Sequence, residues 1–525
     1  MRQRPLHAAA AAIPLAAGAA LIALALAGCA AGGNGAGSPA GGAAAGAGTA
    51  AGPASAAGSG TAAGAAAAAS GSGAATASRT PPRPPARPGS AAADVTERIL
   101  PNGLKLLIKE DHRAPTAVHM AWYRAGSIDE TNGRTGVAHL LEHMMFKGTK
   151  TVPGGEFSRR VAQAGGRENA FTSRDYTGYY QQVPKTRLAE MMTLEADRMT
   201  NLIVSKEEFE REIRVVMEER RLRTDDRAQS LVYEQLMATA FVASPVRTPV
   251  VGWMNDLEQM TWEDARDWYQ AWYTPNNAVV IIVGDVDPAE VIRVAERTYG
   301  RIPARPLPAR KAQEEPQQRG VRRVSVKAPA ENPYVLIGLR VPKLVDIERD
   351  REVYALEVLS AVLSADENGR FVREIVRGSR VANQAGAGYD MTSRGPTLFL
   401  LSGVPADGKT TADVEQAMLA QIARIAREGV DENELRRVKT QYVASQVYSR
   451  DSMMAQAQEM AGMEMSGFSY ADIDRLLEQI RSVTSDEIRA VAGKYFGEDA
   501  MTVVTLLPQP MGERRPPAAA PTRHN

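Results

Sequence analysis

The expected order of strands and helices occurs twice along this chain, and this repetition limits the possible folds more than any other feature. In each half, strand-like segments precede a helix, further strands, two long helices and a closing apolar strand. Four residues that open a long helix in one half recur at the same spacing in the other: Val204, Glu208, Phe209 and Arg211, against Val430, Glu434, Leu435 and Arg437. The repetition predicts an α+β fold made of two similar tandem α/β domains.

The expected elements are placed by the spacing of apolar residues. Those of the first half are strands at 104–109 and 118–123, a helix from about 136, strands near 169–183, helices within 188–223 and a strand at 278–283. Those of the second half are a strand at 334–340, a helix near 352–363, strands near 384–403, helices from 413 and from 431, and a strand at 501–506.

Composition sets the limits of the folded part. Residues 30–93 contain almost only Ala, Gly, Ser, Thr and Pro, and such a segment has no side chains with which to build a core. We therefore expect a disordered tether at 29–93 and, for the Pro- and Ala-rich end of the chain, a disordered tail at 508–525. The two domains are expected at 94–302 and 323–507, joined by a segment rich in Pro, Arg and Gln.

The beginning of the chain has the order of a bacterial lipoprotein signal. Arg2 and Arg4 precede an apolar stretch over 8–27, which ends in small residues before Cys29. This order predicts a signal peptide at 1–28 and a lipid anchor on Cys29, which would hold the protein at a membrane.

Two other interpretations of this segment are an uncleaved membrane helix and a cysteine placed by chance. Ala30 follows the cysteine, and in lipoproteins of double-membraned bacteria a residue other than Asp there resembles the pattern for outer-membrane sorting. We therefore expect an exported protein, lipid-anchored in the outer membrane and facing the periplasm.

Charge and cysteine content exclude other classes. The chain has 62 Lys and Arg against 61 Asp and Glu, a net charge of +1, which provides no basic surface for a nucleic-acid partner. Cys29 is the single cysteine, so neither an intrachain disulfide nor a thiolate zinc site can form.

The chemistry of the first half lies in three residues of one expected helix. His139 and His143 are four positions apart, so both imidazoles project from one helix face and can bind one metal ion. Glu142 stands beside the second histidine and can direct its carboxylate at a water on that metal without being a ligand. This is the H-x-x-E-H arrangement.

A catalytic zinc site needs a third protein ligand and leaves one position open for water. The remaining histidines lie in the signal, near strands or in the tail, so a carboxylate from another helix is expected. The helix after Ser205 offers Glu210, Glu212, Glu218 and Glu219. Spacing alone does not choose between Glu218 and Glu219.

With these residues in place, the sequence resembles the pitrilysin family (M16) of zinc metallopeptidases, the inverzincins, and within it the subunits of the mitochondrial processing peptidase. His139, Glu142 and His143 match the family's metal motif, and residues 212–219 resemble its second motif. The resemblance implies one Zn²⁺ per chain, with Glu219 as third ligand and Glu212 supporting the site. It also implies a metalloendopeptidase in which Glu142 is the general base for a zinc-activated water.

The resemblance also implies how a peptide or unfolded polypeptide binds. The segment from Gly166 to Phe171 corresponds to an edge strand onto which the substrate adds, so Asn169, Ala170 and Phe171 are expected to contact it. The alternative is that 169–172 is an ordinary strand that ends at a turn.

The second half lacks the metal residues, because Ser445 stands opposite Glu219 and the helix at 352–363 has no histidine. In the family this half provides an Arg and a Tyr that stabilise the oxyanion. Arg373 can stand for the arginine, but the expected tyrosine is missing, and Tyr389 is the nearest substitute. Alternatively, a partner chain supplies the pair, and these two residues serve only packing and surface roles.

Two partnerships and two functions follow from the resemblance. The chain would form half of a clamshell chamber, as a homodimer or as a heterodimer with a second pitrilysin-type chain. The alternative to an enzyme is a non-catalytic or partner-dependent subunit of such a complex. The complete set of His139, Glu142, His143 and Glu219 favours the enzyme.

Overall fold

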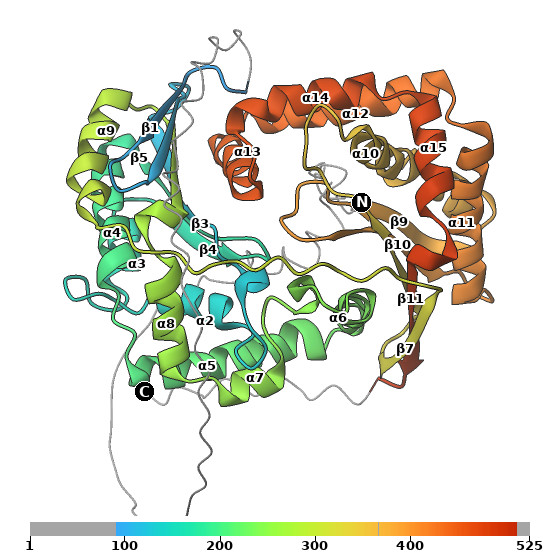
Figure 1. The fold of residues 1–525 in the computed structure, drawn as a ribbon, viewed down its shortest axis with the longest axis horizontal. Coiled ribbons are helices and arrows are strands. Elements are labelled where there is room, and N and C mark those ends of the chain that lie inside the picture. Colours follow the sequence, from blue (N-terminus) through green and yellow to red (C-terminus); the bar gives the residue numbers. More distant parts are fainter. Residues whose placement is uncertain (1–90, 366, 512–525) are drawn as a thin grey trace, which may run out of the picture.

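A computed structural model describes residues 91–365 and 367–511, which form two β-sheets with helices around them (Figure 1). The first sheet contains β1 (Val95–Ile99), β2 (Lys105–Glu110), β3 (Thr116–Tyr123), β4 (Arg167–Thr172), β5 (Thr177–Pro184) and β6 (Ala278–Gly284). The second contains β7 (Arg322–Pro329), β8 (Tyr334–Val341), β9 (Ala382–Tyr389), β10 (Thr397–Pro405) and β11 (Met501–Gln509).

The two sheets have the same topology. The first has the order β1-β2-β6-β3-β5-β4 and the second the order β7-β11-β8-β10-β9, so that β1 alone lacks a counterpart. The pairs β2–β6 and β7–β11 are parallel, whereas the remaining neighbours are antiparallel in both sheets. The prediction of two similar α/β domains is therefore confirmed.

Helices follow the same order in each half. The first half has α2 (Val137–Met144), α3 (Glu156–Gln163), α4 (Leu188–Asn201), α5 (Lys206–Arg220), α6 (Ala228–Ala240), α7 (Met254–Gln259), α8 (Trp262–Trp272) and α9 (Pro288–Arg297). The second half has α10 (Arg351–Ser364), α11 (Thr411–Glu428), α12 (Glu432–Ser449), α13 (Met453–Ser466), α14 (Ile473–Ser482) and α15 (Ser485–Tyr495). Among the α-helices, α6 directly follows α5 and α13 directly follows α12, the two helices whose first residues match between the halves. Helices α6 and α13 are therefore equivalent.

Each of these two equivalent helices packs on the sheet of the other half. Helix α13 lies against β3 and β6, where Met453 and Met460 join the same apolar cluster as Met120 and Ile281 (Figure 1). Helix α6 lies against β7, β8 and β11 of the second sheet. Both faces of each sheet are thereby covered, which explains why β6 is apolar along its whole length rather than alternating.

Close packing against α6 depends on a glycine in the second sheet. A Cβ added at Gly338 of β8 would lie 3.2 Å from Leu236 Cδ2 of α6 and 2.9 Å from Leu398 Cδ1 of β10. Leu236 is fully buried in the cluster formed with Leu336, Leu400 and the closing strand. A residue without a side chain therefore lets the helix approach the strand.

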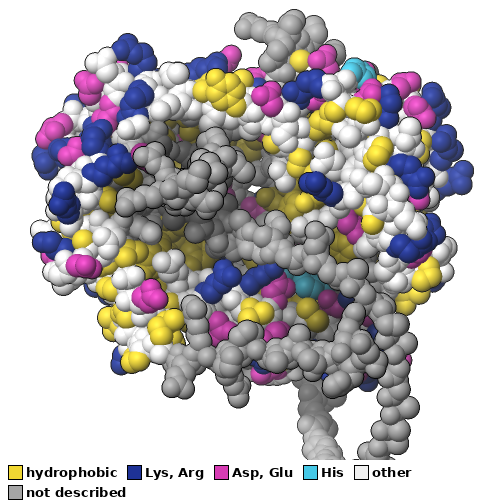
Figure 2. All heavy atoms as spheres, turned by 180° about the vertical axis from the view of Figure 1, so that it is seen from behind, with side chains coloured by type: hydrophobic (Ala, Val, Ile, Leu, Met, Phe, Trp, Pro, Cys, Tyr) yellow, Lys and Arg dark blue, Asp and Glu magenta, His cyan; other side chains and the backbone are white. Residues whose placement is uncertain are grey.

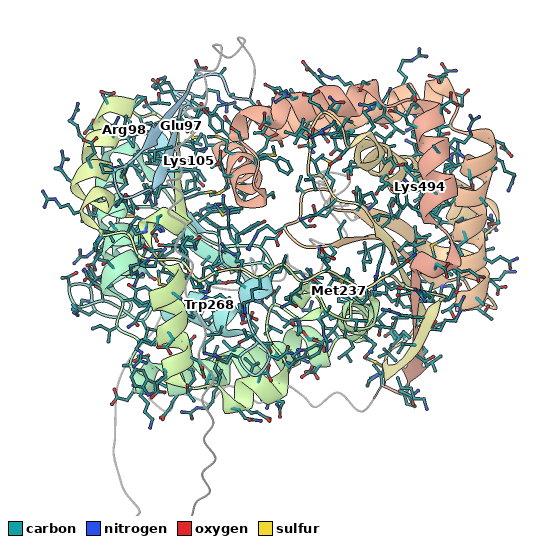
Figure 3. The ribbon with its side chains drawn as sticks, in the orientation of Figure 1. Glu97, Arg98, Lys105, Met237, Trp268 and Lys494 are labelled. Carbon is teal, nitrogen blue, oxygen red and sulfur yellow. The ribbon has the colours of Figure 1, made fainter. Side chains whose placement is uncertain are left out.

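Polar contacts hold α13 on the first sheet. Lys105 Nζ of β2 lies 2.8 Å from Glu464 Oε1 of α13, and Figure 3 labels Lys105 beside this helix and Met237 on α6. Asp111 accepts hydrogen bonds from Arg113 (2.6 Å from its Nη2) and from Gln456 Nε2 of α13 (3.0 Å).

A second contact between the halves involves Arg394, in the loop between β9 and β10. Its guanidinium donates to both carboxylate oxygens of Asp129, whose side chain is 3% exposed, at 2.9 Å, and to the main-chain oxygen of Asp175 at 2.7 Å. Its backbone N–H donates to Asp175 Oδ2 at 2.8 Å. Positive charge from the second half is thus neutralised by carboxylates of the first.

The described part ends slightly later than the expected second domain. Strand β11 continues to Gln509, because Pro508 and Gln509 pair with Ala328 and Pro329 of β7, and the expected tail at 508–525 therefore begins at least two residues too early. Cys29, the signal at 1–28 and the tether at 29–93, except its last three residues, lie outside the described residues. Among the described residues, no helix combines the length and apolar character needed to cross a bilayer.

The surface carries both signs of charge. Figure 2 shows Lys and Arg side chains mixed with Asp and Glu side chains over the face that it presents, in agreement with a net charge of +1. The charged side chains of described residues that this view shows form no broad field of one sign for a polyanion.

The contact between Asp111 and Arg113 predicts a pH-dependent stability. Hydrogen bonds from Arg113 lower the pKa of Asp111 to about 2, below about 3.9 in an unfolded chain, so its contribution is full above about pH 4 and lost as the pH falls towards 2. We expect Asp111→Asn to lower the free energy of unfolding by about 1–2 kcal/mol at pH 7, and by less at pH 3.

Urea unfolding of both proteins at the two pH values measures this difference. The matched control is Asp451→Asn, because Asp451 lies 3.4 Å from the same guanidinium but its side chain is 83% exposed. We expect the control to change stability by less than about 0.5 kcal/mol. An Asp111→Asn effect that stays constant between pH 7 and pH 3 would contradict the assignment.

Candidate metal centre

Helix α2 begins at a glycine that the local packing requires. Gly136 has a φ of +88° as the residue before the helix, and a Cβ there would lie 2.5 Å from the Val251 carbonyl oxygen. The buried Glu130 carboxylate accepts hydrogen bonds from the backbone N–H groups of Gly136 and Ala138, both at 2.9 Å. Glu130 thus satisfies the first turn of the helix and fixes its start.

Two helices bring three potential ligands together. His139 and His143 lie on one face of α2, and Glu219 lies near the end of α5. Glu219 Oε2 is 3.7 Å from His139 Nε2 and 3.3 Å from His143 Nε2. Ligand atoms of the three residues all lie within 4.8 Å of one another.

The protonation of two of these groups suits a metal ligand. Burial lowers the pKa of His139 to about 3, so its imidazole is neutral, and its Nδ1 has no hydrogen-bond partner among the described residues. Burial alone would raise the pKa of Glu219, but its hydrogen bond to His143 and the nearby His139 lower it to about 2. A neutral imidazole and an ionised carboxylate are the forms that bind Zn²⁺.

His143 lies between two carboxylates, those of Glu212 and Glu219. Burial alone would lower the pKa of His143, but hydrogen bonds to Glu212 and Glu219 outweigh it and raise the pKa to about 9. Positive charge is therefore stabilised between this imidazole and Glu219. A divalent cation bound there takes the place of the proton.

Two positively charged side chains, Lys147 and Arg223, contact the carboxylates of Glu212 and Glu219. Glu212 Oε1 lies 3.1 Å from His143 Nδ1, and its other oxygen contacts Lys147 Nζ. Arg223 Nη1, in the π-helical turn after α5, lies 2.5 Å from Glu219 Oε1. Each carboxylate thus directs one oxygen at a histidine and the other at a cation.

Lys147 and Arg223 were not predicted. Arg223 follows Glu219 by four positions on a continuous helical segment, and this spacing was a usable indication. Lys147 lies beyond the end of α2, so helical spacing from His143 did not indicate it.

Glu142 lies next to this cluster and has a different partner. Thr172 Oγ1, at the end of β4, donates a hydrogen bond of 2.6 Å to Glu142 Oε2. Burial raises the pKa of Glu142 to about 7. A carboxylate with a pKa near neutrality can both accept and return a proton.

The cluster faces a cavity of about 540 Å³ between the two halves. From the first half it is lined by His139, Glu142, Glu219 and the turn 171–176, and by residues of α6. From the second half it is lined by the loop between β9 and β10 and by Gly462 and Ser466 of α13. The cavity therefore exists only where both halves meet.

The other predicted site residues are placed differently. Strand β4 is the last strand of the first sheet, and Phe171 at its end lines the cavity, whereas Asn169 and Ala170 do not. Asn169 accepts a hydrogen bond from the Ala170 N–H through its own side chain (2.9 Å).

Arg373 and Tyr389 are not brought to the cavity. The buried Tyr389 hydroxyl donates to the Pro342 carbonyl at 2.5 Å, so its oxygen is held within the second half. Arg373 contacts Glu374 at 2.9 Å and Glu434 at 3.4 Å. Neither residue lines the cavity as the structure describes it.

Comparison with known proteins assigns a family. The family model described as insulinase, peptidase family M16, matches residues 105–252, which contain His139, His143 and Glu219. The family model described as peptidase M16 inactive domain matches residues 259–442. The chain is 30% identical over 421 residues to the zinc protease PqqE of Helicobacter pylori, covering 78% of this chain and 92% of that protein.

Solved structures agree on the fold. The crystal structure of a protease from Helicobacter pylori superposes with a TM-score of 0.75 at 26% identity, covering 79% of this chain and 99% of that one. The periplasmic protease PqqL from Escherichia coli superposes with a TM-score of 0.67 at 20% identity, and the match covers 79% of this chain but 48% of PqqL. By its match to PqqE and to the two family models, the chain belongs to peptidase family M16.

Proposed function

We propose that this protein is a zinc-dependent endopeptidase that hydrolyses peptides or unfolded polypeptides. The observation that carries the proposal is the convergence of His139, His143 and Glu219 at one wall of a cavity, with Glu142 beside them. Relatives named zinc proteases support it.

The donor set fits Zn²⁺. Two imidazole nitrogens and one carboxylate oxygen form the three-ligand set of a catalytic zinc, which leaves a position for water. When bound, zinc lowers the pKa of a water and polarises the scissile carbonyl. Lys147 holds the supporting carboxylate of Glu212 and Arg223 holds the ligand Glu219, so that His143 and Glu219 keep their orientation.

Glu142 moves the protons. Because Thr172 occupies its Oε2, its other oxygen is available to take a proton from the attacking water and deliver it to the leaving amine. A backbone segment of the substrate would pair with the free edge of β4, which ends at Thr172. Thr172, which orients Glu142, would then also lie at the end of the strand with which the substrate pairs.

The partner and the location extend this proposal. The chain corresponds to about half of PqqL, which supports an arrangement in which two such chains, identical or different, enclose a chamber. A second M16 chain would also supply the oxyanion donors that Arg373 and Tyr389 do not bring to this cavity. The sequence of residues 1–30 supports export and lipid anchoring at Cys29, with the folded part facing the periplasm.

Replacing Glu142 by Gln tests the reaction. We expect purified protein to contain about one zinc per chain, measured by plasma mass spectrometry, and to cleave unfolded casein. Glu142→Gln should keep the zinc and lower kcat by about 10²- to 10⁴-fold, because the proton acceptor is lost. Zinc without cleavage in the wild type would favour a partner-dependent or non-catalytic subunit, and absence of zinc would contradict the proposal.

Thr172 provides a finer test of how Glu142 is oriented. Thr172→Val keeps the shape but removes the hydroxyl, whereas Thr172→Ser keeps the hydroxyl. We expect the valine variant to lose about 10- to 100-fold in kcat with little change in KM, since a hydrogen bond to a charged group is lost, and the serine variant to stay near wild type. Equal losses in both would show that Thr172 acts by packing alone.

Lys147 predicts an effect on zinc affinity. Lys147→Met releases Glu212 Oε2, so that His143 is held less firmly, and we expect zinc to bind about 10- to 100-fold more weakly in a competition titration with a chelator. The matched control is Lys150→Met, because Lys150 is exposed and lines no part of the cavity. If the two variants bind zinc with equal affinity, Lys147 does not support the zinc site.

A further inference from the structure

A second cavity adjoins the one that contains the metal cluster. It has a volume of about 200 Å³ and lies in the second half, between the β9–β10 loop, α12, α13 and α14. Thr392 and Gly462 line both cavities, so the two spaces adjoin at these residues. We call the second space the apolar pocket.

The walls of the apolar pocket are large apolar side chains. They come from three different segments: Met391, Met463, Ile473, Leu476, Leu477 and Ile480. Polar groups complete its lining: Thr392, Tyr442, Gln446, Gln458 and Glu459. Its volume is sufficient for a large side chain, since an apolar cavity of about 150 Å³ already accommodates benzene.

Gly462 stands at the junction without a structural need for glycine. It lies inside α13, where glycine is unfavourable compared with alanine. Its φ is not among the positive values that demand glycine, and a Cβ built there meets no atom within 4 Å. The missing side chain leaves open space at a residue that lines both cavities.

We propose that the apolar pocket is a subsite for one large apolar side chain of the peptide substrate, and that Gly462 keeps its entrance open. This inference rests on the proposed peptidase function. The occupant follows from three observations: the pocket adjoins the cavity that Glu142 lines, most of its walls are apolar, and its size matches one side chain rather than a domain surface. The choice of substrate would then depend on a side chain of the peptide that lies away from the scissile bond.

The experiment uses the zinc-loaded full chain and a series of short alanine-rich peptides with one phenylalanine. From one peptide to the next, the phenylalanine stands one position further from the cleaved bond. Mass spectrometry of the products identifies that bond. We expect one or two positions at which phenylalanine raises kcat/KM by about 10-fold over the all-alanine peptide. This ratio should approach one in Gly462→Leu, whose side chain fills the entrance.

The matched control is Gly493→Leu, another glycine inside a helix. Gly493 of α15 is exposed, a Cβ built there has only Ala426 Cβ nearby, at 4.0 Å, and the residue lines neither cavity. We expect the control to keep the wild-type ratio. Gly462→Ala serves as a second variant that improves helix propensity, and its ratio should lie between those of wild type and Gly462→Leu.

Binding separates this inference from the proposed function. Fluorescence anisotropy of labelled phenylalanine and alanine peptides with Glu142→Gln measures the preference without turnover. If the wild type cleaves no peptide but phenylalanine peptides bind more tightly than alanine peptides, and this preference in binding depends on Gly462, the proposed function is contradicted and the subsite is supported. Cleavage with no preferred position, a preference that persists in Gly462→Leu, or no binding of either peptide would overturn the subsite.

Discussion

The structure depends on the exchange of α6 and α13 between its halves. Each sheet has its own helices on one face and requires the equivalent helix of the other half on its second face. Because the apolar area involved is large and contiguous, the halves are held as one body by burial rather than by the connecting segment. The cavity beside the metal cluster is a consequence, since its second wall consists of α13 and the loop that carries Arg394.

In the candidate metal centre, mostly buried carboxylates lie against imidazoles and positively charged side chains. Glu212 and Glu219 are each shared between an imidazole and a cation, so neither carboxylate is left unpaired. Such pairing offsets the cost of burying charge and fixes the orientation of the ligands. Glu142 stands apart from this network, with one neutral hydroxyl as partner, which is consistent with a group that must exchange a proton.

The sequence predicted the repeat, most strands and the pair His139 and His143, because these leave local patterns such as alternation or i, i+4 spacing. Glu219 was chosen over Glu218 by resemblance to the family. It did not predict which sheet α6 and α13 cover, since an apolar helix face does not specify its partner. The end of β11 was predicted too early because Pro508 suggested a tail. Proline is tolerated there because Pro508 lies beyond the segment that β8 pairs with. Arg373 and Tyr389 were chosen by resemblance, and their contacts within the second half could not be read from spacing.

The exchanged helices also constrain how the chain acquires its structure. When the first half has emerged in synthesis, the face of its sheet that carries Met120 and Ile281 still lacks α13, which is encoded near the other end. The contacts that complete the first sheet are therefore long in sequence separation and form late. Until then an apolar sheet face is open to other chains, and such transiently exposed surface is prone to aggregate before the C-terminal helices arrive.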